Sequence, residues 1–528
     1  MTANRRPTIQ RQLGTMANIQ RNIHGNDSRL PLLKQSKLLS AALYIRFSSV
    51  LSAFVHQSCC IVFVRLIISH RTMLGAKMKL LILLAAFFAV ATADGTVSTP
   101  KGVISYTEDW GYVDIRQNAR TFWWLFAVKT EPNRPLILWL QGGPGSDSTG
   151  FGNIDELGPK DINQQDRNST WLQLADLVFV DNPVGTGFSY VSNSNAFTKN
   201  VQQIGKDLVT WAKAFFTKHP EYATRKFYIV CESYGGKMTA EFGKQLQEAI
   251  EDGTVKATLG GVALGDSWIS AMDFVNTWGQ YLYSVSYLDD NQLTTVNAQA
   301  AKCQALVDGQ KWYTATTCWS EMEDLIGILT DGVSWYNILK RGGTDDWSKF
   351  KSSDKSYRTS NKFKTLTAKE RAFNRHLKPL QTESLDNLMN NEMRKKFGII
   401  PDNIRFNAQS GQVFNSQWGD FMTPNYATVD TLLAKGVNVT VFNGQLDLIC
   451  NTLGVELWLK RLTWPSLEKF QKATKSSFGN PSENNGQIFG YHKKYDNLNM
   501  YYILRAGHMV AHDAPWATLA VIKGILGL

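Results

Sequence analysis

One serine stands where an apolar run meets a pair of glycines. Residues 226–238 read KFYIVCESYGGKM, so Ser233 lies between a strand-like run and a predicted helix. A serine on such a sharp strand-to-helix turn is exposed as a nucleophile, and the pattern differs from G-x-S-x-G only by Cys231 in place of the first glycine. The tight turn requires a small residue, and cysteine is small enough. An ordinary turn serine is the alternative, but the context favours a nucleophile.

A serine nucleophile needs a base, and the base needs a carboxylate that orients it. On turns of this kind the partners come later in the chain, in the order Asp and then His. We predict His508 as the base, because it follows the predicted strand 500–504. Asp447 is the predicted partner, because it follows the predicted strand 437–442. His512, which lies one turn further on, is expected to be a surface or capping residue.

The same chemistry needs donors for the oxygen that becomes negatively charged during acyl transfer. Residues 139–145 read WLQGGPG and follow the predicted strand 135–140. Consecutive glycines let the backbone approach a substrate closely. We therefore predict that the amides of Gly143 and Tyr234, the latter directly after Ser233, form the oxyanion hole.

Short apolar runs alternate with helical stretches along the chain and must position these residues. A hairpin is expected over 111–128. The other expected strands are 135–140, 177–180, 227–230, 259–264, 437–442 and 500–504, and two expected helices are 201–217 and 239–251. Continuous apolar strands between helices are typical of a buried, mostly parallel sheet. The prediction is an α/β fold whose chemistry gathers beyond the carboxyl ends of the strands.

Residues 270–425 interrupt this alternation with aromatic and helical stretches, which suggests a helical insertion that forms a lid. Within it, residues 351–378 contain nine Lys and Arg against two acidic residues. A solvated surface loop is the favoured interpretation. The alternative is an exposed loop that is cut during maturation.

Charge is distributed unevenly along the 528 residues, which contain 56 Lys and Arg against 45 Asp and Glu. The first 93 residues hold 12 basic residues and one acid, and 44 of each sign remain in 94–528. The basic excess therefore gives no support for a nucleic-acid partner. A hydrophobic content of 43% and an aromatic content of 12% exclude a disordered chain.

A secretory leader explains the basic N-terminus. Residues 78–93 read MKLLILLAAFFAVATA and have the pattern of a signal peptide, with Asp94 as the expected mature start. Residues 1–77 are then an upstream basic extension, and a membrane anchor with a stem is the alternative. We expect no stable membrane span in the mature protein, and a secreted or lysosomal location. The glycosylation sequons at Asn168 and Asn438 fit that route.

Four cysteines follow the leader. In an oxidising compartment Cys303 and Cys318 are a candidate local disulfide, although sequence does not fix the pairing. Cys231 and Cys450 each lie within three residues of a predicted catalytic residue. Buried thiols are favoured for these two, with a disulfide between them as the alternative.

Together these segments resemble the serine carboxypeptidase family. The matching motifs are WLQGGPG (139–145), ELGP (156–159), DNPVGTGFSY (181–190), ESYGGKM (232–238), NGQLD (443–447) and AGHMV (506–510). With GDSWIS (265–270), they are most similar to the retinoid-inducible branch. The resemblance implies an α/β-hydrolase fold with a helical lid insertion. It also implies a secreted, vacuolar or lysosomal enzyme that removes single C-terminal amino acids at acidic pH.

The resemblance also implies which residues bind the C-terminal carboxylate of the substrate, namely Trp139, Gln141, Gly142, Glu156 and Glu232. Two ionised glutamates would repel that carboxylate. When they are buried together their pKa values rise, since like charges disfavour ionisation. A protonated carboxyl group can donate a hydrogen bond, so binding is predicted to weaken as pH rises.

Several interpretations remain open from the sequence. Asp147 departs from the small residues and serines usual after the GGPG motif, and it is expected either to face solvent or to alter the pH dependence. An acyltransferase, a generic esterase or an inactive secreted peptide-binding homologue are the rival functions. No metal motif is present, so no metal or cofactor is expected. A homodimer stays open.

Overall fold

The computed structural model describes residues 104–342, 366–479 and 486–528. The predicted upstream extension, the signal peptide and most of the basic segment 351–378 lie outside the described residues. All described residues belong to a single compact unit, Thr99–Leu528.

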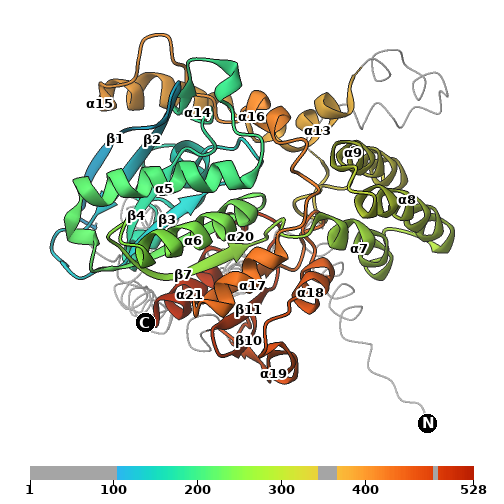
Figure 1. Cartoon of the computed structure of the whole chain (residues 1–528). Coiled ribbons are helices and arrows are strands. Elements are labelled where there is room, and N and C mark those ends of the chain that lie inside the picture. Colours follow the sequence, from blue (N-terminus) through green and yellow to red (C-terminus); the bar gives the residue numbers. More distant parts are fainter. Residues whose placement is uncertain (1–103, 343–365, 480–485) are drawn as a thin grey trace, which may run out of the picture. The chain divides into compact units, whose positions relative to one another are not determined.

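An eleven-stranded sheet runs through this unit (Figure 1). Its order is β1-β2-β4-β3-β6-β7-β8-β11-β10-β9, and β5 pairs with β2. The pairs from β4 to β11 are parallel, and the pairs at both ends of the sheet are antiparallel. The strands are β1 Thr107–Arg116, β2 Ala119–Ala127, β3 Leu136–Leu140, β4 Asp176–Val180, β5 Tyr190–Val191, β6 Lys226–Glu232, β7 Thr258–Gly265, β8 Val439–Gly444, β9 Lys475–Phe478, β10 Gly490–Tyr495 and β11 Leu498–Ile503. The predicted mostly parallel α/β sheet is confirmed.

The predicted strands are all present within a few residues of their expected bounds. The hairpin β1–β2 turns at Asn118, which adopts a positive φ of 63°. The strands β9 and β10 at one end of the sheet were not predicted, because their sequences KSSF and GYHKKY are mostly polar and lack a continuous apolar run. Their strand geometry comes from pairing with β11, which tertiary contacts supply.

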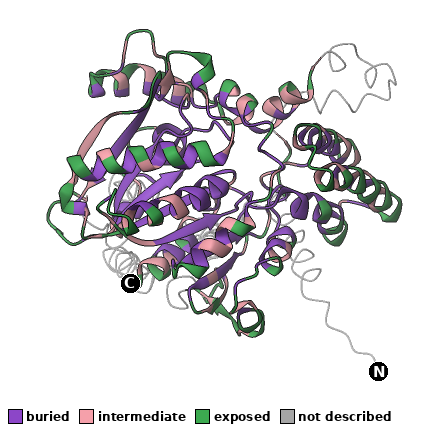
Figure 2. Ribbon diagram, viewed as in Figure 1, coloured by how far each residue is buried: buried purple, intermediate pink, exposed green. Residues whose placement is uncertain are grey.

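Helices cover both faces of the sheet, and the alternation of side chains along each strand separates two cores. In β3, Leu136, Leu138 and Leu140 join one hydrophobic cluster, whereas Ile137 and Trp139 join the other. The first cluster includes α5 (Val201–Lys218), α6 (Gly235–Glu251), α17 (Tyr426–Ala434) and α18 (Thr452–Lys460). The second includes the π-helix η1 (Ser148–Leu157), α20 (Val510–Asp513) and α21 (Pro515–Leu526). Figure 2 shows the central strands buried and the outer helix faces exposed.

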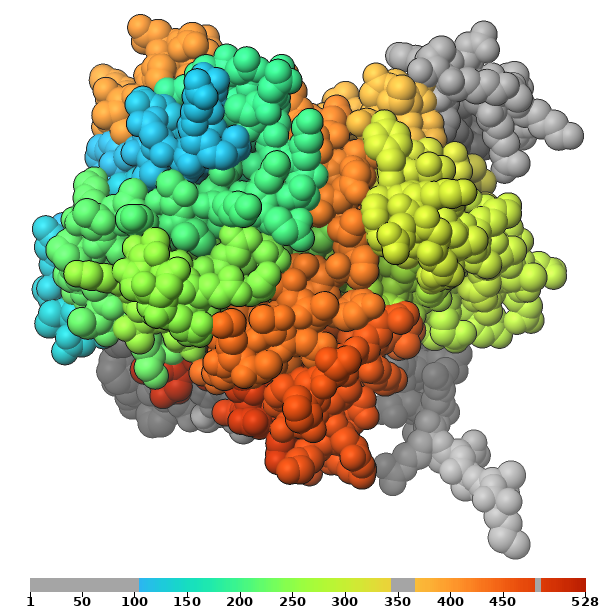
Figure 3. Space-filling view, viewed as in Figure 1, coloured from blue at the N-terminus to red at the C-terminus, as the bar shows by residue number. Residues whose placement is uncertain are grey.

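The insertion between β7 and β8 is helical, as predicted, and leaves these strands paired in parallel with Val262 opposite Val439. Helices α7 (Ala271–Ser284), α8 (Asp290–Asp308) and α9 (Trp312–Leu329) form a block beside the sheet (Figures 1 and 3). The insertion continues with α13 Ala368–His376, η5 Lys378–Leu380, α14 Glu383–Asn387, η6 Leu388–Met393, α15 Arg394–Phe397 and α16 Gly411–Ser416. Not all of it is a lid, because α15 packs at the β1–β2 hairpin, where Trp110 Nε1 donates to the Phe397 carbonyl at 3.0 Å.

The remaining short helices connect these layers: η2 Trp171–Gln173, η3 Ser194–Ala196, η4 Pro220–Tyr222 and α19 Leu467–Lys472. Over the described residues, we find no helix with the length and apolar character that crossing a membrane requires.

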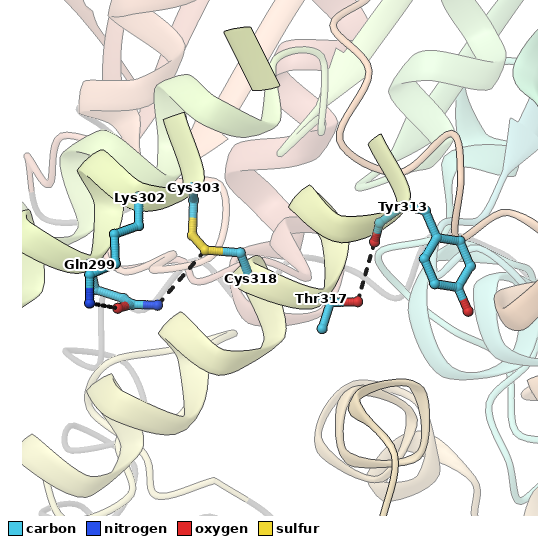
Figure 4. The surroundings of a disulfide bond; sticks show 6 residues. All are labelled: Gln299, Lys302, Cys303, Tyr313, Thr317 and Cys318. Carbon is cyan, nitrogen blue, oxygen red and sulfur yellow. Dashed lines mark hydrogen bonds between the residues drawn. A yellow bond between two sulfur atoms is a disulfide. The ribbon is translucent and has the colours of Figure 1, made fainter. Parts of the chain in front are cut away.

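The predicted disulfide joins Cys303 on α8 to Cys318 on α9 (Figure 4). Both cysteines are buried within the block formed by α7, α8 and α9, and Gln299 Nε2 lies 3.8 Å from Cys318 Sγ. The bond closes a loop over a sequence separation of 15 residues.

Replacing Cys303 and Cys318 by serine is expected to loosen the α8–α9 hairpin. A disulfide that closes a loop of this length stabilises the folded state by about 3 kcal/mol, because the crosslink restricts the unfolded chain. The measurement is hydrogen exchange of α8 and α9 compared with that of α5, which serves as an internal control outside the lid. Unchanged exchange in α8 and α9 would contradict a stabilising role.

Candidate active site

Ser233 occupies the turn between β6 and α6 with a positive φ of 62°. This region of backbone space is unfavourable for a residue with a side chain, so surrounding contacts must hold it. The Ser233 amide donates to the Gly265 carbonyl at 3.0 Å, and the Ser233 carbonyl accepts from the amides of Gly236 and Trp268, both at 2.9 Å. The turn is thus fixed on both sides, as a nucleophile elbow requires.

Small residues surround the turn because no space is left for larger ones. A Cβ atom on Gly142 would lie 2.5 Å from Ser233 Cβ, so only glycine fits there. Cys231 is fully buried, and a Cβ on Gly235 would lie 3.0 Å from the Cys231 Cβ. Burial raises the pKa of the Cys231 thiol to about 11. Cys231 and Cys450 are both free, so the prediction of buried thiols is confirmed and the alternative disulfide between them is wrong.

Asp447 and His508 lie together at the carboxyl ends of β8 and β11. Asp447 Oδ2 is 2.8 Å from His508 Nδ1, and both residues are buried. The Cys450 amide donates to the other oxygen, Asp447 Oδ1, at 3.1 Å. An aspartate in this position selects the His508 tautomer with its proton on Nδ1. The Nε2 atom of His508 then has a free lone pair, as a base requires, and it makes no hydrogen bond with a described residue.

A lid residue supports the histidine from the other side. The ring of Tyr336 stacks on His508 with centroids 4.9 Å apart, and the Tyr336 carbonyl accepts from the His508 amide at 2.7 Å. Tyr336 also lines a pocket at Ser233, with lid side chains that include Trp319, His376 and Phe421. The sequence did not single out these residues, because no motif marks them. His512 is exposed, as predicted.

Gly143 and Tyr234 line the same pocket as Ser233. Gly143 has a φ of 105°, which only glycine adopts readily. Tyr234 caps the N-terminus of α6, where the helix dipole favours negative charge. The two residues therefore lie where oxyanion donors are needed, and their role stays a prediction.

The side chain of Tyr234 is anchored to the end of the insertion. Its hydroxyl donates to Asp420 Oδ2 at 2.7 Å, and Lys237 Nζ lies 2.7 Å from the same oxygen. Lys237 also donates to Thr423 Oγ1 at 2.9 Å and is fully buried. Lys237 is the one lysine or arginine within the matched motifs around the site, and it is engaged in this ion pair.

The five residues implied to bind a carboxylate come together beside the elbow. Trp139 Nε1 donates to Gln141 Oε1 at 2.7 Å, which turns the Gln141 amide nitrogen toward Glu232 Oε1 at 3.0 Å. Gly142 follows Gln141, and Glu156 on η1 is near enough to Glu232 for each to affect the pKa of the other. Neither buried oxygen of Glu156 makes a hydrogen bond with a described residue. Both glutamates are buried.

The ionisation of this glutamate pair is strongly perturbed. Burial raises the pKa of Glu156 to about 8. Burial and the neighbouring charge of Glu156 raise the pKa of Glu232 well above its usual range. The charge of Arg167 has a small lowering effect on the pKa of Glu156. The hydrogen bonds of the Arg167 guanidinium go to the carbonyls of Gly158 and Ile154. The pair therefore retains protons at pH values where exposed glutamates are ionised.

Asp147 is the N-cap of η1, the helix that carries Glu156. Its buried carboxyl group accepts from the amides of Gly150 and Phe151, the latter at 3.2 Å. Burial and the neighbouring charge of Asp181 raise the Asp147 pKa well above its usual range, and burial raises the Asp181 pKa to about 6. The expectation that Asp147 might face solvent is wrong, because the cap draws the side chain inward.

Asp147→Ser is expected to make stability less dependent on pH. Because the folded state raises the pKa of Asp147, it binds more protons than the unfolded chain above about pH 4, so stability falls as pH rises. Serine keeps a capping oxygen without titrating. The measurement is Tm between pH 4 and pH 7. As pH rises over this range, the Tm of the variant should fall by fewer degrees than the Tm of the unaltered protein. Parallel Tm curves would contradict the assignment.

The structure gives the positions of two further features, the predicted glycosylation sites and a group of side chains that could bind a metal, but it does not test either role. Asn168 and Asn438 are both exposed, although Asn438 Nδ2 donates to the Gly260 carbonyl at 3.2 Å. Among the described residues, one group of acidic, histidine and cysteine side chains has ligand atoms within 4.8 Å of one another: Asp447, Cys450 and His508. It coincides with the predicted catalytic residues, so the expectation that no metal takes part stays a prediction.

Comparison with known proteins agrees with this geometry. The family model for serine carboxypeptidases matches residues 99–527. The chain is 46% identical over 421 residues to the retinoid-inducible serine carboxypeptidase of Rattus norvegicus, covering 79% of this chain and 90% of the relative. It is 39% identical to serine carboxypeptidase-like 51 of Arabidopsis thaliana, covering 79% and 92%. Among solved structures, the Kex1 carboxypeptidase of Saccharomyces cerevisiae aligns with a TM-score of 0.64 at 20% identity, covering 81% and 93%.

Proposed function

Because the chain belongs to the serine carboxypeptidase family and is a serine-type carboxypeptidase with an α/β-hydrolase fold, we propose that Ser233, Asp447 and His508 are its catalytic triad. Through an acyl-enzyme it releases single C-terminal amino acids from peptides at acidic pH. Gly143 and Tyr234 are the proposed oxyanion donors. Trp139, Gln141, Gly142, Glu156 and Glu232 bind the C-terminal carboxylate.

One observation carries the exopeptidase assignment. The hydrogen-bonded chain from Trp139 through Gln141 ends at Glu232, the residue that directly precedes Ser233. A carboxylate held by this group and by Glu156 places the last peptide bond of the substrate at the nucleophile. A generic esterase would have no use for a buried glutamate pair at that position.

The reaction follows from the geometry. Ser233 Oγ attacks the carbonyl carbon of the last peptide bond while His508 Nε2 takes the serine proton. The negative oxygen is stabilised by the amides of Gly143 and Tyr234. His508 then gives the proton to the leaving nitrogen, and the C-terminal amino acid departs. Water, deprotonated by His508, cleaves the serine ester, and the proton returns to Ser233.

The acidic preference follows from the glutamate pair. A protonated carboxyl group donates a hydrogen bond to the substrate carboxylate, and an ionised pair repels it. With the pKa of Glu156 at about 8 and that of Glu232 also raised, binding is strongest below neutral pH. Such a preference suits a secreted or lysosomal enzyme, which also fits the predicted leader and sequons.

The test is hydrolysis of a panel of N-blocked dipeptides at pH 5, each compared with its C-terminal amide. We expect release of the C-terminal residue from the free acids and little or none from the amides, with fluorophosphonate labelling as the control for active enzyme. Equal hydrolysis of acids and amides would overturn carboxylate recognition. Adding an amine or alcohol acceptor distinguishes hydrolysis from acyl transfer, which would give a new ester or amide product.

A further inference from the structure

Another acidic residue, Asp266, lies beside the proposed triad, and the reaction steps above do not use it. Asp266 follows β7 in the GDSWIS segment and is 1% exposed. It has a positive φ of 40°, an unfavourable backbone conformation that the surrounding contacts must hold. The residue before it, Gly265, accepts the hydrogen bond from the Ser233 amide. Asp266 is therefore part of the framework that joins the nucleophile to the rest of the site.

The Asp266 side chain is aimed at the loop that carries the catalytic aspartate. Its Oδ1 accepts from the Gly444 amide at 2.8 Å, and its own amide donates to the Phe442 carbonyl at 2.9 Å. Gly444 ends β8, three residues before Asp447. The second oxygen, Asp266 Oδ2, is buried and accepts no hydrogen bond from a described residue. The carboxyl group of Asp447 is the neighbouring charge that acts most strongly on Asp266.

The groups that face Asp266 are almost all acidic. They are Asp447, Asp513 and Glu232, together with the thiol of Cys450. Asp447 already bonds to His508 through Oδ2 and to the Cys450 amide through Oδ1. No lysine or arginine among the described residues pairs with Asp266, and burial beside Asp447 raises the Asp266 pKa well above its usual range.

We propose that Asp266 is a positioning residue that remains protonated and donates a hydrogen bond to Asp447, holding that carboxylate in place against His508. This inference rests on the proposed triad. Two adjacent ionised carboxylates would repel each other, whereas one shared proton joins them. Asp266 acts through Asp447 and does not touch the substrate.

The amide of asparagine offers the same pair of functions as a protonated aspartic acid. Its oxygen can accept from the Gly444 amide, and its nitrogen can donate to Asp447 at every pH. Leucine has a similar size but can do neither. The two substitutions therefore separate the donor function from the charge of Asp266.

The experiment compares Asp266→Asn and Asp266→Leu with the unaltered enzyme, measuring kcat and KM on a blocked dipeptide between pH 4 and pH 9. For Asp266→Asn we expect kcat within about threefold of the unaltered enzyme at pH 5 and a smaller loss of kcat above pH 7. For Asp266→Leu we expect kcat lower by on the order of 100-fold at unchanged KM, as for a misplaced catalytic group. Asp207→Asn is the matched control, because Asp207 is a buried aspartate on α5 that pairs with Arg116 at the end of β1.

Two results would overturn the inference. A folded Asp266→Leu enzyme with normal kcat would show that Asp447 needs no such donor. A loss of kcat in Asp266→Asn as large as in Asp266→Leu would show that asparagine cannot replace the proposed donor. If the leucine variant does not fold, the inference is tested by the dependence of kcat on pH in the asparagine variant alone. Failure of the carboxylate-recognition proposal appears elsewhere, as equal hydrolysis of acids and amides, so the two failures are distinguishable.

Discussion

Replacing Ser233 by alanine is expected to lower kcat by about 10⁴- to 10⁶-fold, because it removes the atom that forms the acyl-enzyme. Folding should be little affected, since the backbone bonds of the elbow to Gly265, Gly236 and Trp268 do not involve the hydroxyl. The measurements are release of the C-terminal residue at pH 5 and labelling by a fluorophosphonate probe. Both should be lost while Tm stays close to that of the unaltered enzyme.

A matched control for this variant is Ser284→Ala, which changes an exposed serine at the end of α7. That variant should retain both labelling and hydrolysis. Labelling that persists in Ser233→Ala would place the nucleophile at another serine and remove the basis for the proposed triad. Hydrolysis without labelling would instead point to a reaction that does not pass through a serine ester.

The second large effect is expected at the glutamate pair. In the unaltered enzyme KM for a peptide with a free C-terminus should rise between pH 6 and pH 9. The sign follows from the raised pKa values: the pair binds the substrate while it holds its protons and loses that ability as pH rises past about 8, the pKa of Glu156. A change confined mainly to KM is expected, because the carboxylate is bound by the pair but forms and breaks no bond during the reaction.

Substitutions of the pair separate hydrogen bonding from charge. Glu156→Gln together with Glu232→Gln keeps donors that do not titrate, so KM should become nearly independent of pH. Glu232→Ala removes the group that Gln141 contacts and should raise KM by roughly 10- to 100-fold, as the loss of a buried hydrogen bond to a charged group does. The C-terminal amide of the same peptide serves as the control. A pH profile of KM that is the same for acid and amide would contradict the role of the pair.

Local sequence was sufficient to predict the candidate catalytic residues. The elbow around Ser233 and the glycines of the WLQGGPG segment have short-range signatures, because the turn geometry restricts which residues fit. Asp447 and His508 could be placed because each follows an apolar strand, and parallel strands bring their carboxyl ends to one edge of the sheet. The structure brings these residues together as that rule requires, with Asp447 and His508 2.8 Å apart.

The surroundings of the triad could not be found in this way. Tyr336 and Asp420 belong to the insertion, and their contacts with His508 and Tyr234 join residues far apart in the chain. Asp147 gave a misleading signal, because an acidic residue in a loop is usually solvated and only the helix that follows it draws it inward. The polar strands β9 and β10 could not be predicted from the sequence for a related reason, since their strand conformation depends on pairing with a neighbouring strand.

The sequence by itself determined the candidate nucleophile, its candidate base and the positions of the strands that precede them, because steric demands at a tight turn and the burial of apolar strands act over a few residues. The tertiary structure decided which side chains surround those groups and in what protonation state. Glu156, Glu232, Asp266 and Asp447 are ordinary acids in the sequence. They form one buried cluster only after η1, β6, β7 and β8 are packed together, and that burial raises the pKa values of the first three.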